Sequence, residues 1–583
     1  MNSTNPYPLS KPKLIAFSAI TCSLFFLLVE GVLAIFDIPK GESSQDPFVG
    51  FSSQERLFTD SVFIKNGKKI PVMITYPDKL ELFPNELFTK MKSANTLRAF
   101  CVGGSTTYGR PYSPRTSFCS WLEDFLNYVD LDHKWEVINA GGVSYASYRI
   151  VLLMDELIQY EPDLVVVYTG HNEFLERRTY SKILRLPMVL RDLGTLASKL
   201  RTYSLLNNFI GYWTSGKSKA GYVHKLSKEV NPILDQSVGP HDYTRDEEQK
   251  KDVVAHFRFN LTRIIRLARS VDSKVILVTP ASKMRHEAPF KSQHRDDLGK
   301  PALEEWIRNY AWALELVRQK EFEEALIHVL NAETLDPRYA HTFALKGDIL
   351  FSLGRYGEAK MAYRKAIDED VCPLRAISAL GTSVNDIGHE MNVPVVDFDS
   401  IISERSPEGI TGEELFLDHV HPTIEGHKIL ALEIMDEIIK SGLVRAPRPM
   451  TEGGIESIEK IKMSQVDREG HAEALMNLAM LANWGGKFRE GITLATRAMD
   501  LDPEYVDAYY RFDWVRSYDV DVDLGEANMA SGKDMEAKIE HLLTIKNEAE
   551  LDSNFHNPSM RVEILGRYGV IKPPPERIER AGD

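Results

Sequence analysis

Five short runs of apolar, β-prone residues recur along the chain, separated by segments with helical periodicity. Runs that are apolar at consecutive positions predict strands buried on both faces, as in a parallel sheet. The helix-period segments between them predict the crossover helices that parallel strands require. The sequence therefore predicts an α/β fold with helices on both faces of a parallel sheet. The predicted strands are Arg98–Gly103, Glu136–Ala140, Asp163–Thr169, Lys274–Pro280 and Val393–Phe398.

The composition is that of an ordinary folded protein and argues against nucleic-acid binding. The 583 residues are 43% hydrophobic and 26% charged, with a formal net charge of −14. An acidic surface repels phosphate backbones, so we expect no nucleic-acid partner. At about 100–200 residues per domain, the length predicts about two to four domains. Four cysteines cannot form a disulfide framework, and only a Cys101–Cys119 bridge is left open.

The N-terminal segment is apolar over residues 14–36, apart from small polar residues and one glutamate. At about 1.5 Å per residue, a helix of this length crosses a bilayer core. Lys11 and Lys13 precede it and favour a cytoplasmic N-terminus. We therefore expect a cytoplasmic tail at 1–13, an uncleaved membrane anchor and export of the rest to the periplasmic or extracellular side. A signal peptide cleaved after Val32–Ala34 is the alternative.

The remaining chain divides around the predicted sheet. Residues 37–97, rich in Pro, Phe and Lys, are expected to form a stalk that packs onto the first domain. The α/β domain is expected in two parts, 98–305 and 374–446. The first part contains a long apolar-rich connection at 174–248, which predicts either a lid over the strand ends or a helical hairpin that extends the core.

An internal repeat with a period of about 34 residues precedes the fifth predicted strand. Small residues recur where paired helices must approach closely. This pattern resembles the tetratricopeptide helix-turn-helix repeat and predicts two units at 306–373. A third, at about 472–505, lies within a C-terminal helical region at 447–583. The resemblance implies a protein or extended-polymer partner on the concave face. The recurring residues are Phe322, Ala325 and Ala332, then Tyr356, Ala359 and Ala366.

The turn after the first predicted strand, "VGGSTTYG", presents Ser105. It is not a phosphate-binding loop because no lysine follows Gly109, and it lacks the dinucleotide fingerprint. It is also not the G-x-S-x-G elbow, because Thr107 replaces the last glycine. Ligands of open α/β sheets bind at the carboxyl ends of the strands. Ser105 is therefore a candidate nucleophile, with a helix-capping role as the alternative.

A serine nucleophile needs a base, a group that orients the base, and donors for the oxyanion. Asp418 and His421 follow the fifth predicted strand, three residues apart in "FLDHVHPTIEGH". This spacing lets the carboxylate accept the Nδ1–H of His421 and leaves Nε2 for Ser105. Asn172 follows the third strand in "YTGHNEF" and is a candidate donor or a turn residue. His419, His421 and His427 could form a metal cluster, but no acidic or Cys partner other than Asp418 lies at a zinc-like spacing, so no metal or other cofactor is predicted.

These blocks resemble those of the SGNH (GDSL-like) hydrolase superfamily over about residues 98–445, excluding the repeats. Ser105, Gly170–Asn172 and Asp418–His421 match its motifs in order. The resemblance implies a flavodoxin-like, five-stranded parallel sheet. It also implies acyl transfer through an ester on Ser105, with His421 as general base and Asp418 as the residue that orients it.

The resemblance also implies an oxyanion hole. Its donors would be the Ser105 N–H, the Asn172 side chain and one backbone N–H from the second block, "NAGGVSYASY". Counting from Asn139 puts that N–H at Ser144, whereas Gly141 lies earlier, so both are candidates.

Two further positions bear on the site. The aspartate that usually precedes the family's serine is Gly104 here, which does not remove the base. After the fourth strand, Arg285 and His286 are candidates for binding a polar or anionic substrate, with a solvated loop as the alternative.

The sequence as a whole predicts a membrane-anchored SGNH-type serine esterase that acts on an ester-bearing substrate, such as a glycan or a lipid. One alternative is an O-acyltransferase that modifies an envelope polysaccharide, because the same residues can pass the acyl group to a sugar hydroxyl. The other is a non-catalytic repeat scaffold with a vestigial hydrolase domain.

Overall fold

The computed structural model describes residues 45–46, 51–52, 56–65, 67–176, 240, 243–464, 466, 468–484 and 487–501. Apart from the two-residue strands β1 (Gln45–Asp46) and β2 (Phe51–Ser52), these belong to one compact unit. The predicted anchor and most of the predicted lid lie outside the described residues. None of the described helices is both long enough and apolar enough to span a bilayer.

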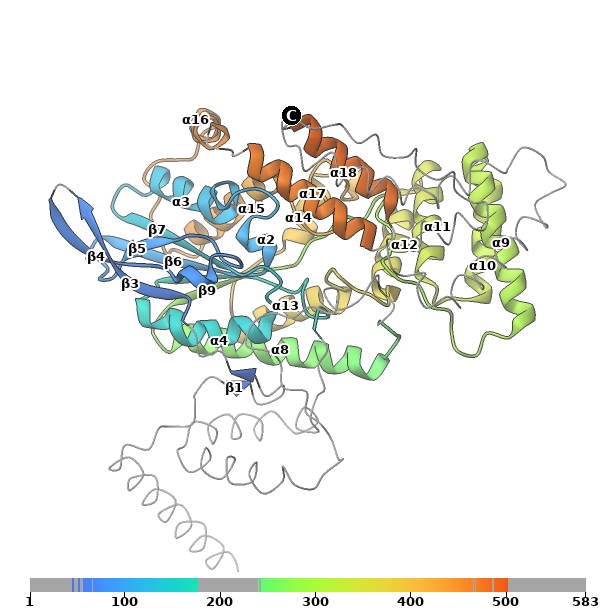
Figure 1. Cartoon of the computed structure of the whole chain (residues 1–583), viewed down its shortest axis with the longest axis horizontal. Helices are drawn as coiled ribbons and strands as arrows, with labels where there is room; N and C mark the ends of the chain where they lie inside the picture. The colour runs from blue at the N-terminus through green and yellow to red at the C-terminus, as the bar shows by residue number, and fades with distance from the viewer. Residues whose placement is uncertain are drawn as a thin grey trace, which may run out of the picture. The chain divides into compact units, whose positions relative to one another are not determined.

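A five-stranded parallel sheet forms the centre of this unit (Figure 1). Its strand order, β7-β6-β8-β9-β10, is the 2-1-3-4-5 order of flavodoxin-like folds. The predicted α/β fold with a parallel five-stranded sheet is therefore confirmed. The strands are β6 (Thr96–Gly103), β7 (Lys134–Gly141), β8 (Leu164–Tyr168), β9 (Lys274–Val278) and β10 (Val395–Val396).

Alternate residues of each strand enter two separate cores. Phe100 and Val102 of β6 pack under α4, α8 and α13, whereas Ala99 and Cys101 pack under α3 and α15. This alternation is the period of two of a β-strand, and both faces are apolar because both are covered (Figure 1). The helices are α3 (Phe118–Val129), α4 (Ser147–Leu157), α8 (Glu247–Arg269), α13 (Ser378–Met391) and α15 (Ile424–Lys440).

The cysteines within these cores are unpaired with each other. Cys101 and Cys119 are buried free thiols, so the bridge that the sequence left open is not formed.

The segment expected to form a stalk contains a three-stranded antiparallel sheet that packs onto the α/β domain. Its strands are β3 (Phe58–Lys65), β4 (Lys68–Thr75) and β5 (Leu87–Thr89). The Phe58 and Phe88 rings meet edge to face at 4.9 Å, and both contact Phe100 of the central sheet. These rings make the small sheet part of the core, because the apolar area they bury is shared with β6.

Four helices between β9 and β10 form two antiparallel pairs. The alanines at the repeated positions, Ala325, Ala332, Ala359 and Ala366, are at most 1% exposed. Their small side chains let the paired helices pack closely, and the tetratricopeptide assignment itself stays a prediction. The pairs also contact Met284 of the α/β domain. The helices are α9 (Lys300–Gln319), α10 (Phe322–Leu335), α11 (Ala340–Ser352) and α12 (Tyr356–Glu369).

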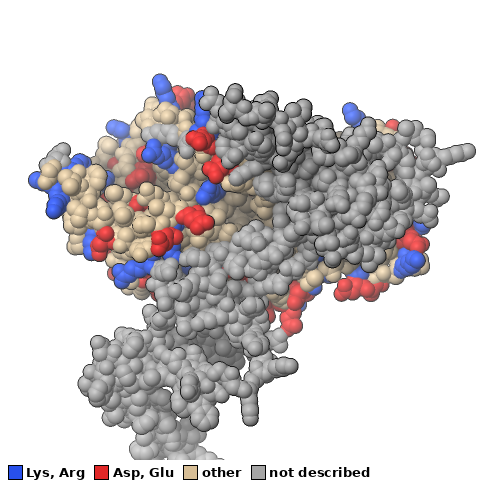
Figure 2. Space-filling view, in the orientation of Figure 1, with Lys and Arg blue, Asp and Glu red and all other residues tan. Residues whose placement is uncertain are grey.

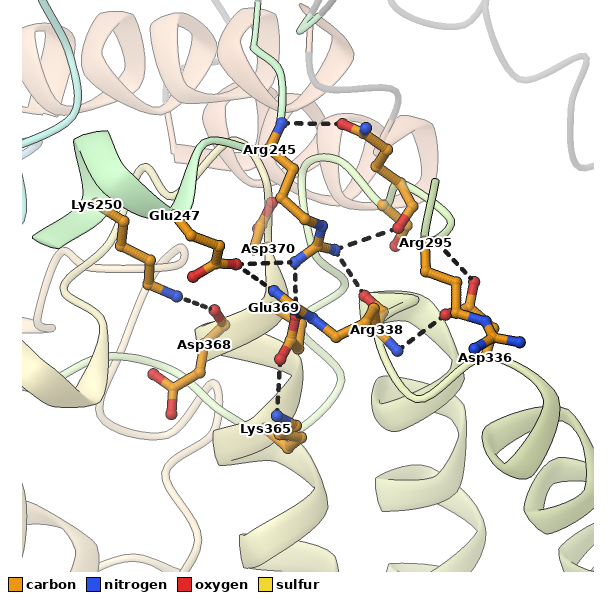
Figure 3. A network of polar contacts seen from close by, with 12 residues as sticks. Arg245, Glu247, Lys250, Arg295, Asp336, Arg338, Lys365, Asp368, Glu369 and Asp370 are labelled. Carbon is orange, nitrogen blue, oxygen red and sulfur yellow. Dashed lines mark hydrogen bonds and ion pairs between the residues drawn. The ribbon is translucent and has the colours of Figure 1, made fainter. Parts of the chain in front are cut away.

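A polar network ties this helical insertion to the amino-terminal end of α8 (Figure 3). Glu369, at the end of α12, accepts hydrogen bonds from Arg245 at 2.6 Å and from Arg338 at 2.7 Å. Lys250 of α8 donates to the carbonyl of Asp368 at 2.6 Å. These contacts join three separate parts of the sequence, so the insertion is attached to the α/β domain through charged groups as well as apolar ones.

The C-terminal part of the described chain is helical. Its last two helices, α17 and α18, form a hairpin that we call the C-terminal hairpin. In Figure 2, basic and acidic side chains are interspersed over the described surface of the face shown, without a basic stripe. The remaining helices of four or more residues are α2 (Ser105–Tyr108), α14 (Phe398–Glu404), α16 (Glu452–Met463), α17 (Arg468–Trp484) and α18 (Phe488–Leu501).

Candidate active site

Ser105 is the first residue of the one-turn helix α2, directly after β6 ends at Gly103. The two glycines before it are closely packed. A Cβ at residue 103 would collide with the Thr107 side chain and the Tyr168 carbonyl, and a Cβ at residue 104 would collide with Asn172 Nδ2. A side chain at residue 104 would therefore require the Asn172 side chain to shift.

Ser105, His421 and Asp418 form one hydrogen-bonded series. His421 Nε2 lies 2.8 Å from Ser105 Oγ, and His421 Nδ1 lies 2.7 Å from Asp418 Oδ2. An ionised carboxylate can only accept, so this geometry assigns the proton to Nδ1 and leaves Nε2 free to accept from the serine hydroxyl. The three-residue spacing thus brings together the side chains that the sequence predicted to meet.

The turn that carries Asp418 is fixed by the same carboxylate. Asp418 Oδ1 accepts the backbone N–H groups of Val420 at 2.9 Å and His421 at 2.7 Å. Burial alone raises the pKa of Asp418, but electrostatic interactions with His421 and His419 and the hydrogen bonds from His421 lower it further than burial raises it. The net pKa lies well below the usual value, so Asp418 is ionised and able to orient His421.

The structure shows the surroundings of two predicted oxyanion donors, Ser105 and Asn172, whose role stays a prediction. As the first residue of its helix, Ser105 has an N–H without an acceptor inside α2. Asn172 Nδ2 donates one proton to the Tyr145 carbonyl at 3.0 Å, which holds the amide beside Gly104 with a second N–H remaining.

Of the two second-block candidates, Ser144 fits the donor role better than Gly141, and that role stays a prediction. Ser144 has a φ of 63°, a left-handed conformation, and its N–H has no hydrogen-bond acceptor among the described residues. Gly141 fits less well, because its N–H donates to Asn139 Oδ1 at 3.0 Å. A Cβ at Gly141 would also collide with the backbone of α2 at Thr107 and Tyr108, so this glycine permits close packing instead.

Asn139 has a role that sequence reasoning missed. Its amide nitrogen donates to the carbonyls of Thr107 at 3.0 Å and Tyr108 at 3.1 Å, which end the nucleophile turn. Asn139 therefore anchors α2 to the end of β7. The signal was a buried asparagine at a strand end, but nothing in the sequence identified α2 as its partner.

The left-handed conformation of Ser144 gives a prediction. In the Ser144→Gly variant we expect kcat to stay within about twofold, because the proposed donor is the backbone N–H. The free energy of unfolding should rise by about 1 kcal/mol, because a non-glycine residue is strained at this φ. Ester-hydrolysis kinetics and urea unfolding measure the two effects. In Ser144→Val, a β-branched side chain disfavours this φ, and a kcat equal to that of wild type would contradict the assignment of this N–H.

Arg285 and His286, the candidates for substrate binding, both have partners in the helical insertion. Arg285 donates to Glu414 Oε2 at 2.7 Å, and its guanidinium lies over the Phe351 ring of α11. The ring of His286 faces Asp348, also in α11, at 3.4 Å. These contacts lie at the junction between the loop after β9 and the helical insertion, and substrate binding by the two residues stays a prediction.

Three histidines near the candidate site are buried and neutral. Burial is the main cause that lowers the pKa of His171 to about 3, of His419 to about 4 and of His427 to about 3. His171 Nδ1 accepts the N–H of Ala376 at 3.2 Å. Among the described residues, no group of His, Cys, Asp or Glu side chains is arranged to hold a metal ion.

The buried His427 predicts a pH-dependent difference in stability. The pKa of His427 is lower in the folded protein than in the unfolded chain. Its contribution to the free energy of unfolding is therefore complete above the unfolded pKa of 6.5 and is lost as the pH falls toward about 3. Buried carboxyls with raised pKa, such as Asp370 at about 6, act in the opposite direction, so a single-residue comparison is required. When the pH is lowered from 7.5 to 4.5, we expect the free energy of unfolding of His427→Phe to rise by about 2–3 kcal/mol relative to that of wild type.

Urea unfolding followed by tryptophan fluorescence at several pH values measures this gain. A difference between His427→Phe and wild type that is the same at pH 7.5 and at pH 4.5 would contradict the prediction.

Three of the solved structures that the chain matches are hydrolases of low sequence identity. The lipase/acylhydrolase from Enterococcus faecalis is 14% identical, with a TM-score of 0.28 over 60% of this chain and 100% of that chain. The acetylxylan esterase Axe2 from Geobacillus stearothermophilus is 14% identical, with a TM-score of 0.25 over 60% and 96%. A GDSL-like lipase from Bacteroides thetaiotaomicron is 12% identical, with a TM-score of 0.26 over 61% and 93%. These similarities do not bear on substrate.

No curated protein matches the chain. The family described as GDSL-like Lipase/Acylhydrolase matches residues 100–434, more than half of the chain. This range begins in the strand before Ser105 and ends in α15, beyond His421. The chain therefore belongs to the GDSL-like lipase/acylhydrolase family, whose members hydrolyse esters.

Proposed function

We propose that this protein is a serine esterase that works through a covalent acyl-serine intermediate on Ser105. One observation carries the proposal: the unbroken hydrogen-bonded series from Ser105 through His421 to Asp418. The series follows β6, at the point where the strand order of the sheet reverses and α/β proteins bind their ligands.

In the first half-reaction, Ser105 Oγ attacks the carbonyl carbon of the ester while His421 Nε2 takes the hydroxyl proton. The negative charge that develops on the carbonyl oxygen is stabilised by the N–H groups of Ser105 and Ser144 and by the Asn172 amide. The tetrahedral intermediate then collapses, and the protonated His421 gives its proton to the leaving alcohol. Asp418 stabilises the imidazolium through the Nδ1–H hydrogen bond.

In the second half-reaction, water attacks the acyl-serine while His421 takes its proton. Collapse of the second tetrahedral intermediate releases the carboxylic acid and returns the proton to Ser105 Oγ. The net reaction is hydrolysis of an ester to an acid and an alcohol, and the chain's own residues account for every proton transfer.

The proposal extends to location and partners. The apolar segment 14–36, with lysines on its amino-terminal side, supports a membrane anchor with the hydrolase domain exported. The paired helices α9–α12 support a protein-binding role for the repeats. On this account, the substrate is an acyl ester carried by a glycan or lipid of the cell envelope.

The full chain in detergent, assayed with 4-nitrophenyl esters of increasing acyl length, tests the activity. We expect turnover of at least one ester, with a burst of 4-nitrophenol when deacylation limits the rate. Parallel assays with added sugars measure the acyl acceptor. Absence of turnover with every ester would contradict the proposal. Acylated sugar as the main product would show that the protein is an acyltransferase and not an esterase.

A further inference from the structure

The C-terminal hairpin contacts both loops that carry the candidate active site. Tyr112 follows the nucleophile turn and Leu417 directly precedes Asp418, and both belong to the apolar cluster formed with α17 and α18. The Tyr112 ring lies 4.1 Å from that of His471 in α17. The hairpin therefore packs against the loops that bear the proposed nucleophile and the proposed base.

Lys487, in the turn of this hairpin, is buried against the α/β domain. Its side chain is 6% exposed, and its ammonium forms an ion pair with Glu287 Oε1. Glu287 lies in the loop after β9 and its side chain is 0% exposed. The same ammonium lies 3.7 Å from the centre of the Phe290 ring, a cation–π contact.

Phe290 and Glu287 lead from Lys487 to Asp418. The Phe290 ring packs edge-on against His419 at 4.9 Å, and His419 Nδ1 lies 3.8 Å from Asp418 Oδ2. Lys283 provides a second connection. Its ammonium lies 3.4 Å from Glu287, and its backbone N–H donates to the His419 carbonyl at 3.1 Å. One residue of the hairpin is thus linked through two short paths to the turn that holds His421.

Loss of the Lys487 ammonium would leave Glu287 with an incomplete set of partners. Burial raises the pKa of Glu287, but Lys487, Lys283 and Arg375 together lower it to about 2, so the carboxylate is charged. A buried charge deprived of its partner is costly, and the surrounding structure relaxes to solvate it. The groups free to shift are the ones that touch Glu287 and Phe290, which include the His419–Asp418 segment.

We propose that Lys487 is a positioning residue, through which the C-terminal hairpin fixes the Asp418–His421 turn in its reactive geometry. This inference rests on the proposed function, because it concerns the geometry of the same acyl-transfer site. It makes the hairpin a part of the working active site, although the hairpin lies outside the region matched by the hydrolase family.

The test compares Lys487→Met, Lys487→Arg and Lys462→Met in the full chain, with 4-nitrophenyl acetate as substrate. Lys462 is the matched control: its side chain is also 6% exposed, but it binds Ser120 and Asp124 on α3. We expect Lys487→Met to lower kcat by about tenfold to a hundredfold with KM within about twofold, because misplacement of catalytic groups affects the chemical step. Lys487→Arg should keep most of the activity, and Lys462→Met should keep kcat.

A second variant separates positioning from a general loss of folding. Lys487→Met combined with Glu287→Gln removes both charges of the ion pair. We expect the kcat of this double variant to be at least about threefold higher than that of Lys487→Met alone. Equal kcat in Lys487→Met and Lys462→Met, or no recovery in the double variant, would overturn the inference. Failure of the proposed function is distinguishable, because wild type itself would then hydrolyse no ester.

Discussion

Replacement of Ser105 by alanine is expected to lower kcat for ester hydrolysis by a factor of about 10⁴ or more. The hydroxyl that attacks the carbonyl is lost, and with it the acyl-enzyme route. The residual rate would come from the oxyanion donors and from substrate binding. Ser105 is only partly buried and begins a one-turn helix, so the fold should be preserved. Steady-state kinetics with 4-nitrophenyl acetate measure the loss.

Ser113→Ala is the matched control for this experiment. Ser113 is also a partly buried serine in the loop after β6, and its hydroxyl caps a short helical turn through the Arg115 N–H. Its replacement should leave kcat unchanged. A Ser105→Ala variant that keeps more than a tenth of the wild-type kcat would show that another residue is the nucleophile.

Replacement of Asp418 by asparagine is expected to lower kcat by about 10⁴ with little change in KM. Asparagine can still accept the N–H groups of Val420 and His421 through its oxygen. Its NH₂ group, however, would face His421 Nδ1, so the imidazole would carry its proton on Nε2 and could not accept from Ser105. Measurement of kcat and KM across pH with 4-nitrophenyl acetate tests this expectation.

The chain contains its own control for this substitution. Asp130 and His133 have the same three-residue spacing: Asp130 accepts the N–H of His133 and lies 3.1 Å from its Nδ1. Asp130 is also buried, but among the described residues no serine hydroxyl is hydrogen-bonded to His133 Nε2. Asp130→Asn should therefore leave kcat unchanged. If Asp418→Asn and Asp130→Asn had equal activities, Asp418 would not orient the base.

The central sheet was predictable because each strand is apolar on both faces. Phe100 and Ala99 face opposite cores, so the run "RAFCVG" reads as a continuous apolar segment that only a doubly covered strand explains. The series of Ser105, His421 and Asp418 was predictable for a related reason. Parallel strands place their carboxyl ends at one edge, and the loops that follow them carry these residues.

Other parts of the site depend on contacts that no local pattern encodes. Gly141 and Ser144 are both plausible donors in the sequence, and only the bond from Gly141 to Asn139 separates them. Arg285 follows a strand, but its partners, Glu414 in the loop before Asp418 and Phe351 in the helical insertion, lie far along the chain. Tertiary context decides these cases, since the competing partner lies elsewhere in the chain.

The three-stranded sheet formed by β3, β4 and β5 illustrates a different difficulty. Val62 and Ile64 are 55% and 64% exposed, so the apolar pattern of β3 does not mark its buried face. The residues that attach this sheet to the core are Phe58 and Phe88, near the strand ends. A sequence pattern averaged over the segment therefore resembles a linker instead of a sheet.

The most direct test of the central claim is the site of covalent modification by a fluorophosphonate probe. Such probes form an adduct with an activated serine, and mass spectrometry of the digested protein identifies the modified peptide. We expect a single adduct on Ser105, its loss in Ser105→Ala, and much slower labelling in His421→Ala, because the base no longer activates the hydroxyl. An adduct on another residue, or labelling of His421→Ala at the wild-type rate, would contradict the proposal that Ser105 is a nucleophile activated by His421.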